Sequence, residues 1–424
     1  MDRLSPQWAL ALLATACGGG GGATDDLGIS DAIGDGGVPA APFVTETVIE
    51  DTRAVDVRLA IAATGVAAVA FRAEVDGTTP CAETVPPGNA PAQAIRVAIE
   101  EGGWTVEDVA TVGPGDGLDV LWQDDDVLVL FQGGTSGARV CAPSDLVLAS
   151  RAAGYAGPIL VAASGDAPSA VPYSTDGDVV GDYPAAGLLA GDLVVAYGDT
   201  HFGYTRDDFE RADLEVYRSG APEVVDAATG AGTANALALG PDGAVAVAFA
   251  NRSGTASLDQ FGVWLATRDG ATWGLDRVMA TDPDTSVGVA FDGDVPVIAF
   301  FDDEEQDLVV ARPQGDGFTL ERIDRRFTTG LYADLASDGA RLAVSFYYCG
   351  RDGRADCDPD EDALRWGVLE GGAWRIEQVD AGGGGERCGV HTSIGFRPDG
   401  RAVIAYACHA LGGASGRLMI AEEM

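Results

Sequence analysis

Acidic side chains at alternate positions mark one segment toward the C-terminal end of the chain. They are Asp356, Asp358, Asp360 and Asp362. Alternating carboxylates can turn their oxygens toward one hard cation, and Ca²⁺ takes roughly six to eight oxygen ligands. The segment is no EF-hand loop, because counting from Asp356 or Asp358 gives neither Gly at the sixth position nor Glu at the twelfth. Two interpretations remain, a calcium site and a solvated acidic loop.

A second segment, from Asp199 to Arg211, places aromatic rings beside Arg and Asp side chains. Exposed rings can stack on a sugar or a peptide, while the charged groups supply directed hydrogen bonds. The binding residues predicted in this segment are His201, Phe202, Tyr204, Arg206 and Phe209. Tyr347 and Tyr348, ahead of the acidic segment, complete the predicted binding set. The alternative is that Phe202, Tyr204 and Phe209 fold down into a small apolar cluster.

The seven cysteines divide into Cys17, near the N-terminus, and six in the body of the chain. An even number of cysteines in an exported protein indicates disulfide bonds. The pairs that we prefer are Cys81–Cys141, Cys349–Cys357 and Cys388–Cys408. A competing interpretation is a metal site, because the side chains of four residues are usable ligands: Cys388, His391, Cys408 and His409.

The sequence motifs of several common enzyme classes are missing from the chain. It has no Ser-His-Asp order, no P-loop and no His-Glu-x-x-His motif. Two carboxylates near a central axis could still hydrolyse a glycosidic bond. The sequence therefore predicts no catalytic residue and no required cofactor, and a polysaccharide-active hydrolase or lyase is kept as an alternative.

The charge of the chain excludes two classes of partner. There are 66 acids against 26 basic residues, all of them Arg, and the formal net charge is −40. Such a surface repels nucleic acid and anionic lipid, whereas it attracts divalent and organic cations. The alternative explanation is an adaptation to salt or for solubility.

The N-terminal residues have the pattern of a targeting segment. Trp8–Ala16 is apolar but too short to span a bilayer, and it ends at Cys17, before five glycines. Leu13–Cys17 resembles a bacterial lipobox, which implies a diacylated Cys17 at the mature N-terminus. The prediction is a signal peptide over 1–17, a flexible tether over 18–42, and an exported protein held by lipid in the cell envelope, at the outer membrane or cell surface. An ordinary cleaved signal and a chance apolar run are the alternatives.

One strand pattern recurs along the rest of the chain. A short apolar run ends in an aromatic residue seven times, at spacings of 46 to 66 residues, at Phe71, Phe131, Tyr197, Phe249, Phe300, Phe346 and Tyr406. Asp-Gly turns precede several copies, and Asp-Gly between apolar runs is a strong hairpin signal. A second motif, an aromatic, two residues, an acid, one residue and Val or Ile, follows at Trp104, Trp273, Phe318 and Trp374. Units of four strands, a to d, at this period indicate an all-β propeller.

The two ends of the chain complete one another in this pattern. The seventh unit has only three strands, over 392–396, 401–406 and 417–422, while Phe43–Val48 fits the motif of a fourth strand. The sequence therefore predicts seven four-stranded antiparallel blades over 43–424, with the N-terminal strand closing the last blade and leaving no open sheet edge. The recurrent tryptophans are expected to pack between blades. They are Trp104, Trp273, Trp366 and Trp374.

The repeat resembles exported bacterial β-propellers of the sialidase-like type with degenerate Asp-boxes. Thr267–Trp273 is similar to an Asp-box but one residue short. The resemblance implies the fold and not the activity, because the Arg-Ile-Pro signature of true sialidases is absent and their arginines, Tyr–Glu pair and acid cannot be assigned here.

The longest connections join strands b and c, at Arg72–Pro91, Gly198–Arg211, Ala250–Gln260 and Tyr347–Asp362. Insertions gathered on one face of a repeat protein usually mark its binding face. We therefore expect a monomeric, surface-tethered binding or scaffolding propeller that recognises a glycan, peptide or protein through its b–c face, assisted by Ca²⁺. A structural envelope lipoprotein is a further alternative.

Overall fold

The computed structural model describes residues 42–81, 88–113, 115, 117–133, 144–163, 179–200, 212–227, 230–252, 260–284, 286–351, 353, 357–411 and 415–424. Cys17, Cys141, Asp356 and the predicted binding residues of the 199–211 segment lie outside these ranges. No helix among the described residues is long and apolar enough to cross a membrane.

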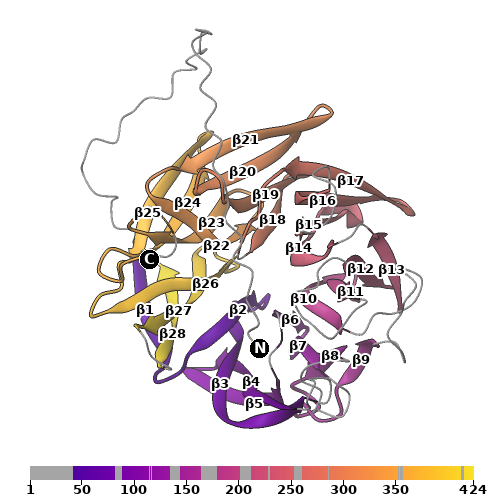
Figure 1. The fold of residues 1–424 in the computed structure, drawn as a ribbon, viewed down its shortest axis with the longest axis vertical. Helices are drawn as coiled ribbons and strands as arrows, with labels where there is room; N and C mark the ends of the chain where they lie inside the picture. The colour runs from indigo at the N-terminus through magenta and orange to yellow at the C-terminus, as the bar shows by residue number, and fades with distance from the viewer. Residues whose placement is uncertain are drawn as a thin grey trace, which may run out of the picture. The chain divides into compact units, whose positions relative to one another are not determined.

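Residues 42–424 form seven antiparallel four-stranded sheets arranged as the blades of a propeller (Figure 1). Blade 1 contains β2 (Ala54–Ile61), β3 (Ala67–Cys81), β4 (Gly88–Glu100) and β5 (Trp104–Val112). Blade 2 contains β6 (Leu118–Gln123), β7 (Asp126–Gly133), β8 (Asp145–Ser150) and β9 (Ile159–Ala162). Blade 3 contains β10 (Val179–Leu189), β11 (Asp192–Thr200), β12 (Ala212–Arg218) and β13 (Ala221–Asp226).

The remaining blades follow the same order along the chain. Blade 4 contains β14 (Thr233–Leu239), the 3-10 turn η2 (Pro241–Gly243), β15 (Val245–Asn251), β16 (Gly262–Asp269) and β17 (Thr272–Met279). Blade 5 contains β18 (Val287–Asp292), β19 (Val295–Asp302), β20 (Asp307–Gln314) and β21 (Gly317–Asp324). Blade 6 contains β22 (Thr328–Ser337), β23 (Leu342–Cys349), β24 (Ala363–Glu370) and β25 (Ala373–Asp380).

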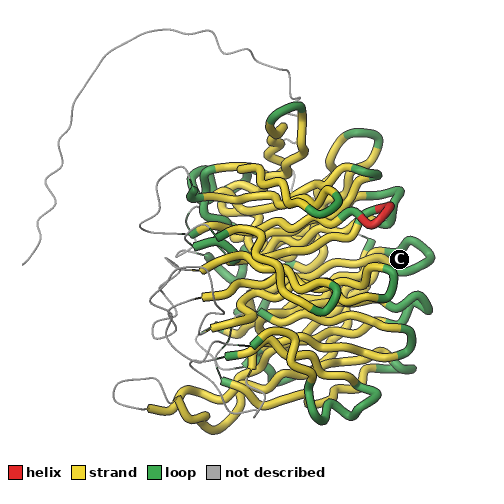
Figure 2. Tube along the Cα trace, turned by 90° about the vertical axis from the view of Figure 1, so that its right-hand side faces the viewer, coloured by secondary structure: helices red, strands yellow, loops and turns green. Residues whose placement is uncertain are grey.

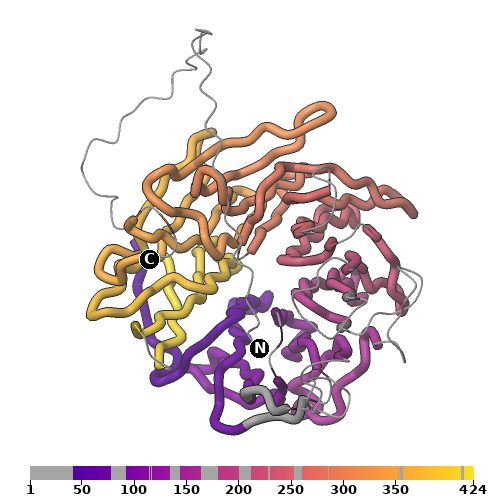
Figure 3. Tube along the Cα trace, in the orientation of Figure 1, coloured from indigo at the N-terminus to yellow at the C-terminus, as the bar shows by residue number. Residues whose placement is uncertain are grey.

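Blade 7 is built from both ends of the propeller, as the sequence predicts. It contains β26 (Glu386–Phe396), β27 (Ala402–Ala410), β28 (Gly416–Glu423) and the N-terminal strand β1 (Phe43–Ile49). Strand β1 pairs antiparallel with β28 from Phe43 opposite Glu423 to Ile49 opposite Leu418. Figure 3 shows this indigo strand beside the yellow end of the chain. The ring of blades is therefore closed by backbone hydrogen bonds.

Strand a of each blade lies at the axis and touches strand a of both neighbouring blades, in an unbroken ring from β2 round to β26. The strands run between two faces, one carrying the short a–b and c–d turns and the other the b–c and d–a connections (Figure 2). Small Ala and Val side chains alternate along the inner strands, so neighbouring sheets can pack closely.

The predicted tryptophans pack as expected. Trp366 is fully buried, and the ring of Phe43 from the closing strand meets it edge-on with 5.2 Å between ring centroids. Trp104, Trp273 and Trp374 are partly buried against the apolar clusters between blades 7 and 1, 3 and 4, and 5 and 6. The aromatic repeat is thus an inter-blade packing device.

One of the predicted b–c loops proves to be mostly strand, and another begins inside a strand. Arg72–Pro91 is a hairpin in which β3 and β4 extend past the blade, and pairing resumes at Thr78 opposite Pro91 after a bulge. Tyr347 and Tyr348 lie inside β23, with 3% and 8% of their surfaces exposed, and not on an open loop as expected. The apolar run of strand b continues through both residues, so burial in the sheet outweighs the loop signal of the acids that follow.

Candidate functional site

In or just before strand a of every blade, toward the b–c face, the residue at one corresponding position has a left-handed backbone conformation. These residues are Asp56, Gly117, Tyr183, Ala234, Asp284, Tyr332 and His391, with φ between 49° and 76°. The pairing register of β2, β10, β14, β22 and β26 slips at this point, which marks a β-bulge. A bulky residue with positive φ is strained, and such strain often accompanies function.

Five of these positions hold side chains that can bind a ligand, and we call them the axial mouth: Asp56, Tyr183, Asp284, Tyr332 and His391. All five are half-buried. The rings of Tyr332 and His391 are in contact, with 4.5 Å between their centroids and an angle of 49° between their planes. Burial, with the nearby charges of Asp284 and Asp56, raises the pKa of Tyr332 to about 12. Carboxylates of blades 1 and 5 therefore help to raise the pKa of a tyrosine in blade 6.

A second row of side chains supports the mouth from blade 7 and blade 6. The His391 ring lies 5.8 Å from the His409 ring, and Nε2 of His409 lies 2.7 Å from the Ala54 carbonyl oxygen. Burial lowers the pKa of His391 to about 3, aided by His409 and two arginines, and burial also lowers the pKa of His409. Both imidazoles are therefore uncharged at neutral pH.

The buried Tyr347 hydroxyl donates a hydrogen bond to Asp362. Burial raises the pKa of Asp362, and Nε of Arg387 lies 3.7 Å from one carboxylate oxygen. Nη2 of Arg387 donates to the Cys357 carbonyl at 2.9 Å. One of the predicted calcium ligands is thus part of a buried hydrogen-bond network behind the mouth.

A second predicted calcium ligand, Asp358, also has partners within the protein. Asp358 forms an ion pair with Arg351 and accepts a hydrogen bond from the Asp360 backbone at 3.1 Å. Asp356 lies outside the described residues, so the calcium site stays a prediction.

Two of the predicted disulfides are present on this face. Cys349 bonds to Cys357, and Cys388 bonds to Cys408 across the paired strands β26 and β27. The alternative metal site at Cys388, His391, Cys408 and His409 is therefore wrong, because an oxidised cysteine has no thiolate to offer. Within the described part of the chain, both gatherings of three metal-ligating side chains include these bonded cysteines. The Cys81–Cys141 pair stays a prediction, since Cys141 is not described.

A cavity of about 190 Å³ lies on the axis, lined by strand a of all seven blades. We call it the axial chamber. Its polar lining residues follow the bulges in sequence: Arg58, Asp119, Asn235, Ser286, Asp334 and Ser393. Strand a runs from the b–c face toward the a–b turns, so the chamber lies deeper than the mouth.

The chamber acids join neighbouring blades. Asp119 of blade 2 accepts hydrogen bonds from the backbone N–H of Val120 at 2.8 Å and of Ala186, in blade 3, at 2.6 Å. Asp334 of blade 6 accepts from the Ser393 hydroxyl and the Ile394 N–H of blade 7, both at 2.9 Å. Burial raises the pKa of Asp119 to about 6 and also raises that of Asp334, while Arg58 opposes both shifts.

Neither the mouth nor the chamber was predicted from the sequence. A signal was present, because strand a repeatedly carries a polar or charged residue before a short apolar run, as in Asp119-Val-Leu and Asp334-Leu-Ala. These residues are scattered along the chain, and only closure of the ring brings them together.

Comparison with known proteins gives a likeness of fold. No family model matches the chain, and no curated protein matches it in sequence. A protein of unknown function from Dyadobacter fermentans is 14% identical, with 92% of this chain and 99% of that chain covered and a TM-score of 0.49. The NanB sialidase of Streptococcus pneumoniae is 10% identical, with 90% and 71% covered and a TM-score of 0.46. The α-L-arabinofuranosidase Arb93A of Fusarium graminearum is 11% identical, with 92% and 98% covered and a TM-score of 0.44.

Proposed function

We propose that this protein is a binding propeller that recognises a neutral glycan at the axial mouth. The observation that supports the proposal is the ring of left-handed residues, in which Tyr and His occupy strained positions that glycine fills without cost at Gly117. Strain at a bulky side chain is retained where that side chain has a use. Direct recognition by a set of aromatic rings and carboxylates is such a use.

The chemistry of the mouth favours a sugar over a charged ligand. Uncharged His391 and Tyr332 offer ring faces and neutral hydrogen-bonding groups. The Asp56 carboxylate, which lies 3.4 Å from Nε of Arg72, has further lone pairs that can accept from hydroxyls. The net charge of −40 disfavours polyanions. A neutral oligosaccharide presents hydroxyl donors and apolar C–H faces, which match this set.

The test is calorimetric titration of the oxidised protein against a panel of neutral oligosaccharides. Tyr332→Ala should weaken binding by about tenfold or more, as expected for a central aromatic contact. Asp316→Asn, on an exposed c–d turn of the opposite face, is the matched control and should bind like the parent. The proposal fails if no glycan binds, or if mouth variants bind normally while opposite-face variants do not.

Glycoside hydrolysis is the second candidate, because Asp119 and Asp334 both line the axial chamber. Two carboxyl groups are what such chemistry uses. We favour binding, since both oxygens of each acid already accept hydrogen bonds from the backbone or a serine hydroxyl. Turnover of a glycan that Asp119→Asn and Asp334→Asn each abolish, with the fold retained, would establish the hydrolase instead.

For location, we propose export and anchoring through a lipid on Cys17. The two disulfides support an oxidising compartment. Metabolic labelling with palmitate should mark the parent protein, and Cys17→Ser should lose the label. A labelled Cys17→Ser variant would exclude this anchor.

For the acidic segment, we propose that Asp356, Asp358, Asp360 and Asp362 assist binding by holding Ca²⁺. Calcium should then raise the melting temperature, and a chelator should reverse the rise. Asp360→Asn should reduce the rise, and an unchanged rise in that variant would place the calcium effect elsewhere.

A further inference from the structure

We infer that Phe327 is a second contact for the glycan, so that the ligand is an oligosaccharide of several residues and not a single sugar ring. The inference rests on the proposed function, because it extends the ligand of the axial mouth. Three observations support it: the exposure of the Phe327 ring, its left-handed backbone, and its place on the face of the mouth.

Phe327 is the one exposed aromatic side chain in the described part of the chain, with 50% of its surface accessible to solvent. Its φ is 58°, in the left-handed region that bulky residues rarely adopt. An apolar ring in water and a strained backbone each cost stability, and here both costs fall on one residue. Such a combination is retained where the side chain has a use.

Phe327 lies in the connection from β21 to β22, on the b–c face, directly before the strand that carries Tyr332. The two residues are five positions apart, so their Cα atoms are separated by at most about 18 Å. A ligand of several sugar residues can therefore reach from one to the other.

The two rings belong to opposite sides of blade 6. The Phe327 ring lies 6.3 Å from the Tyr348 ring, and the Tyr332 ring lies 6.3 Å from the Tyr347 ring. Neighbouring residues of a strand point to opposite faces of the sheet. A ligand that touches both Phe327 and Tyr332 therefore crosses the start of β22, which a single sugar ring does not span.

The Phe327 ring is presented on a firm base. Tyr348 beneath it is only 8% exposed, and the guanidinium carbon of Arg365 lies 3.2 Å from the Tyr348 ring centroid. Arg365 in turn lies 2.7 Å from Asp324, at the end of β21. Because the base is already ordered, a sugar that stacks on the ring loses little affinity to the ordering of side chains.

The surroundings of the ring suit a sugar. The apolar C–H face of a sugar can stack on an exposed ring, while polar groups beside the ring orient the hydroxyls. Exposed Arg325 lies two positions before Phe327. Arg351, whose side chain is 48% exposed, accepts a hydrogen bond at its carbonyl from the Thr328 N–H at 3.2 Å. Guanidinium groups are donors to hydroxyl oxygens.

The experiment is calorimetric titration of the whole oxidised protein with homologous series of neutral oligosaccharides. The probes are the cello-, malto-, xylo- and manno-oligosaccharides, each from disaccharide to hexasaccharide. In the parent, affinity should rise roughly fivefold to tenfold from the shortest to the longest member of the series that binds, as one added aromatic contact provides.

Three variants locate the rise. Phe327→Asn removes the ring but tolerates positive φ, so it should bind the disaccharide like the parent, lose the rise with length, and melt within about 2 °C of the parent. Tyr332→Ala should instead weaken every member of the series. Val295→Ala removes an exposed apolar side chain at an a–b turn of the opposite face and should change neither.

The inference is overturned if the parent binds all lengths alike, or if Phe327→Asn keeps the rise. In both cases glycan binding at the mouth still holds. A lower melting temperature with an unchanged rise also overturns it, since Phe327 then serves only to pack on Tyr348.

Should Phe327→Asn not fold, Phe327→Leu decides the question, because it keeps an apolar side chain without a ring. Loss of the rise in that variant supports the contact, and a full rise refutes it. If no series binds the parent, the proposed function and this inference both fail.

Discussion

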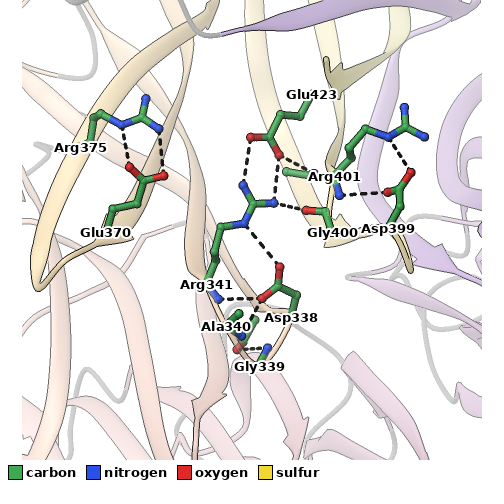
Figure 4. A network of polar contacts seen from close by, with 12 residues as sticks. Asp338, Gly339, Ala340, Arg341, Glu370, Arg375, Asp399, Gly400, Arg401 and Glu423 are labelled. Atoms are coloured by element: carbon green, nitrogen blue, oxygen red, sulfur yellow. Dashed lines mark hydrogen bonds and ion pairs between the residues drawn. The ribbon is translucent and has the colours of Figure 1, made fainter.

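The two faces of the propeller are stabilised in different ways. On the a–b face, arginines join neighbouring blades by ion pairs to carboxylates. Arg151 of blade 2 reaches Glu101 of blade 1, Arg268 of blade 4 reaches Glu223 of blade 3, and Arg341 of blade 6 reaches Glu423 of blade 7. Figure 4 shows Arg341 held between Asp338, Glu423 and the Gly400 carbonyl. An arginine–carboxylate ion pair between neighbouring blades therefore recurs on this face.

The b–c face instead uses buried polar groups, disulfides and strained backbone. Asp324 of blade 5 lies 2.7 Å from Arg365 of blade 6, both almost fully buried, and Gln132 of blade 2 donates to the buried Asp182 of blade 3. These contacts between described residues differ from one pair of blades to the next. Repetition on one face and variety on the other indicate that the first maintains the ring, while the second carries what is particular to this protein.

Both faces depend on closure of the ring, so the largest effect should come from deleting the closing strand. A chain lacking residues 1–49 exposes the edge of β28 and the Trp366 ring. It should unfold at a much lower temperature, or fail to fold cooperatively, as followed by calorimetry. A chain that begins at Pro42, whose carbonyl accepts from the Met424 N–H, is the control and should melt like the parent. Equal melting of both deletions would mean that β1 does not close the ring.

Of the two described disulfides on the b–c face, the Cys388–Cys408 bond should be the stronger stabiliser. It closes a segment of 20 residues, so replacing both cysteines by Ser should lower the free energy of unfolding by about 3 kcal/mol. The Cys349–Cys357 bond closes only 8 residues and should contribute somewhat less. Urea unfolding of the two double variants checks the order, and the reverse order would contradict this interpretation.

On the a–b face, Arg397 should matter more than Arg401. Arg397 lies 3.0 Å from Glu100 of blade 1 and 2.8 Å from Glu422, and its side chain is 9% exposed, whereas that of Arg401 is 44% exposed. Arg397→Ala should cost about 2 kcal/mol, because it removes the ion pair of the partly buried Glu100 and leaves Glu422 with Arg401 alone. Arg401→Ala should cost no more than about 0.5 kcal/mol. Comparable losses in urea unfolding would show that burial is not what distinguishes these pairs.

The smallest effect should be a pH dependence at the mouth. The pKa of His391 is about 3 in the folded protein and about 6.5 in the unfolded chain, so the unfolded chain binds the proton more tightly. Stability is therefore lost as the pH falls from 6.5 toward 3. Asn tolerates the left-handed backbone, so the His391→Asn variant should fold. Between pH 6.5 and 5, its free energy of unfolding should fall by roughly 1 kcal/mol less than that of the parent.

Chemical unfolding at both pH values measures this difference. Asp119 acts in the opposite sense, because its raised pKa favours the folded state as the pH falls toward 4, but it does so equally in both proteins. Parallel pH profiles for parent and variant would show that His391 is not titrated on unfolding.

The pattern of the chain was sufficient for the blades and their closure. An apolar strand that ends in an aromatic residue has the period of a blade, and Phe43–Val48 completes a motif that the seventh unit lacks. Such patterns are local, and a strand carries its own alternation into the sheet. The Cys349–Cys357 and Cys388–Cys408 pairs followed in the same way, because each pair belongs to a single blade.

Only the tertiary structure decided which side chains meet at the axis. Tyr332 and His391 lie 59 positions apart in the sequence, yet their rings are in contact at the mouth. Asp119 and Asp334 lie 215 positions apart, yet both line the chamber. Sequence could not show that Tyr347 is buried in β23 or that Asn235 donates to the Tyr183 carbonyl of blade 3, because both depend on the tertiary structure. The repeat thus determined the ring, while the bulges and the contacts between blades determined its chemistry.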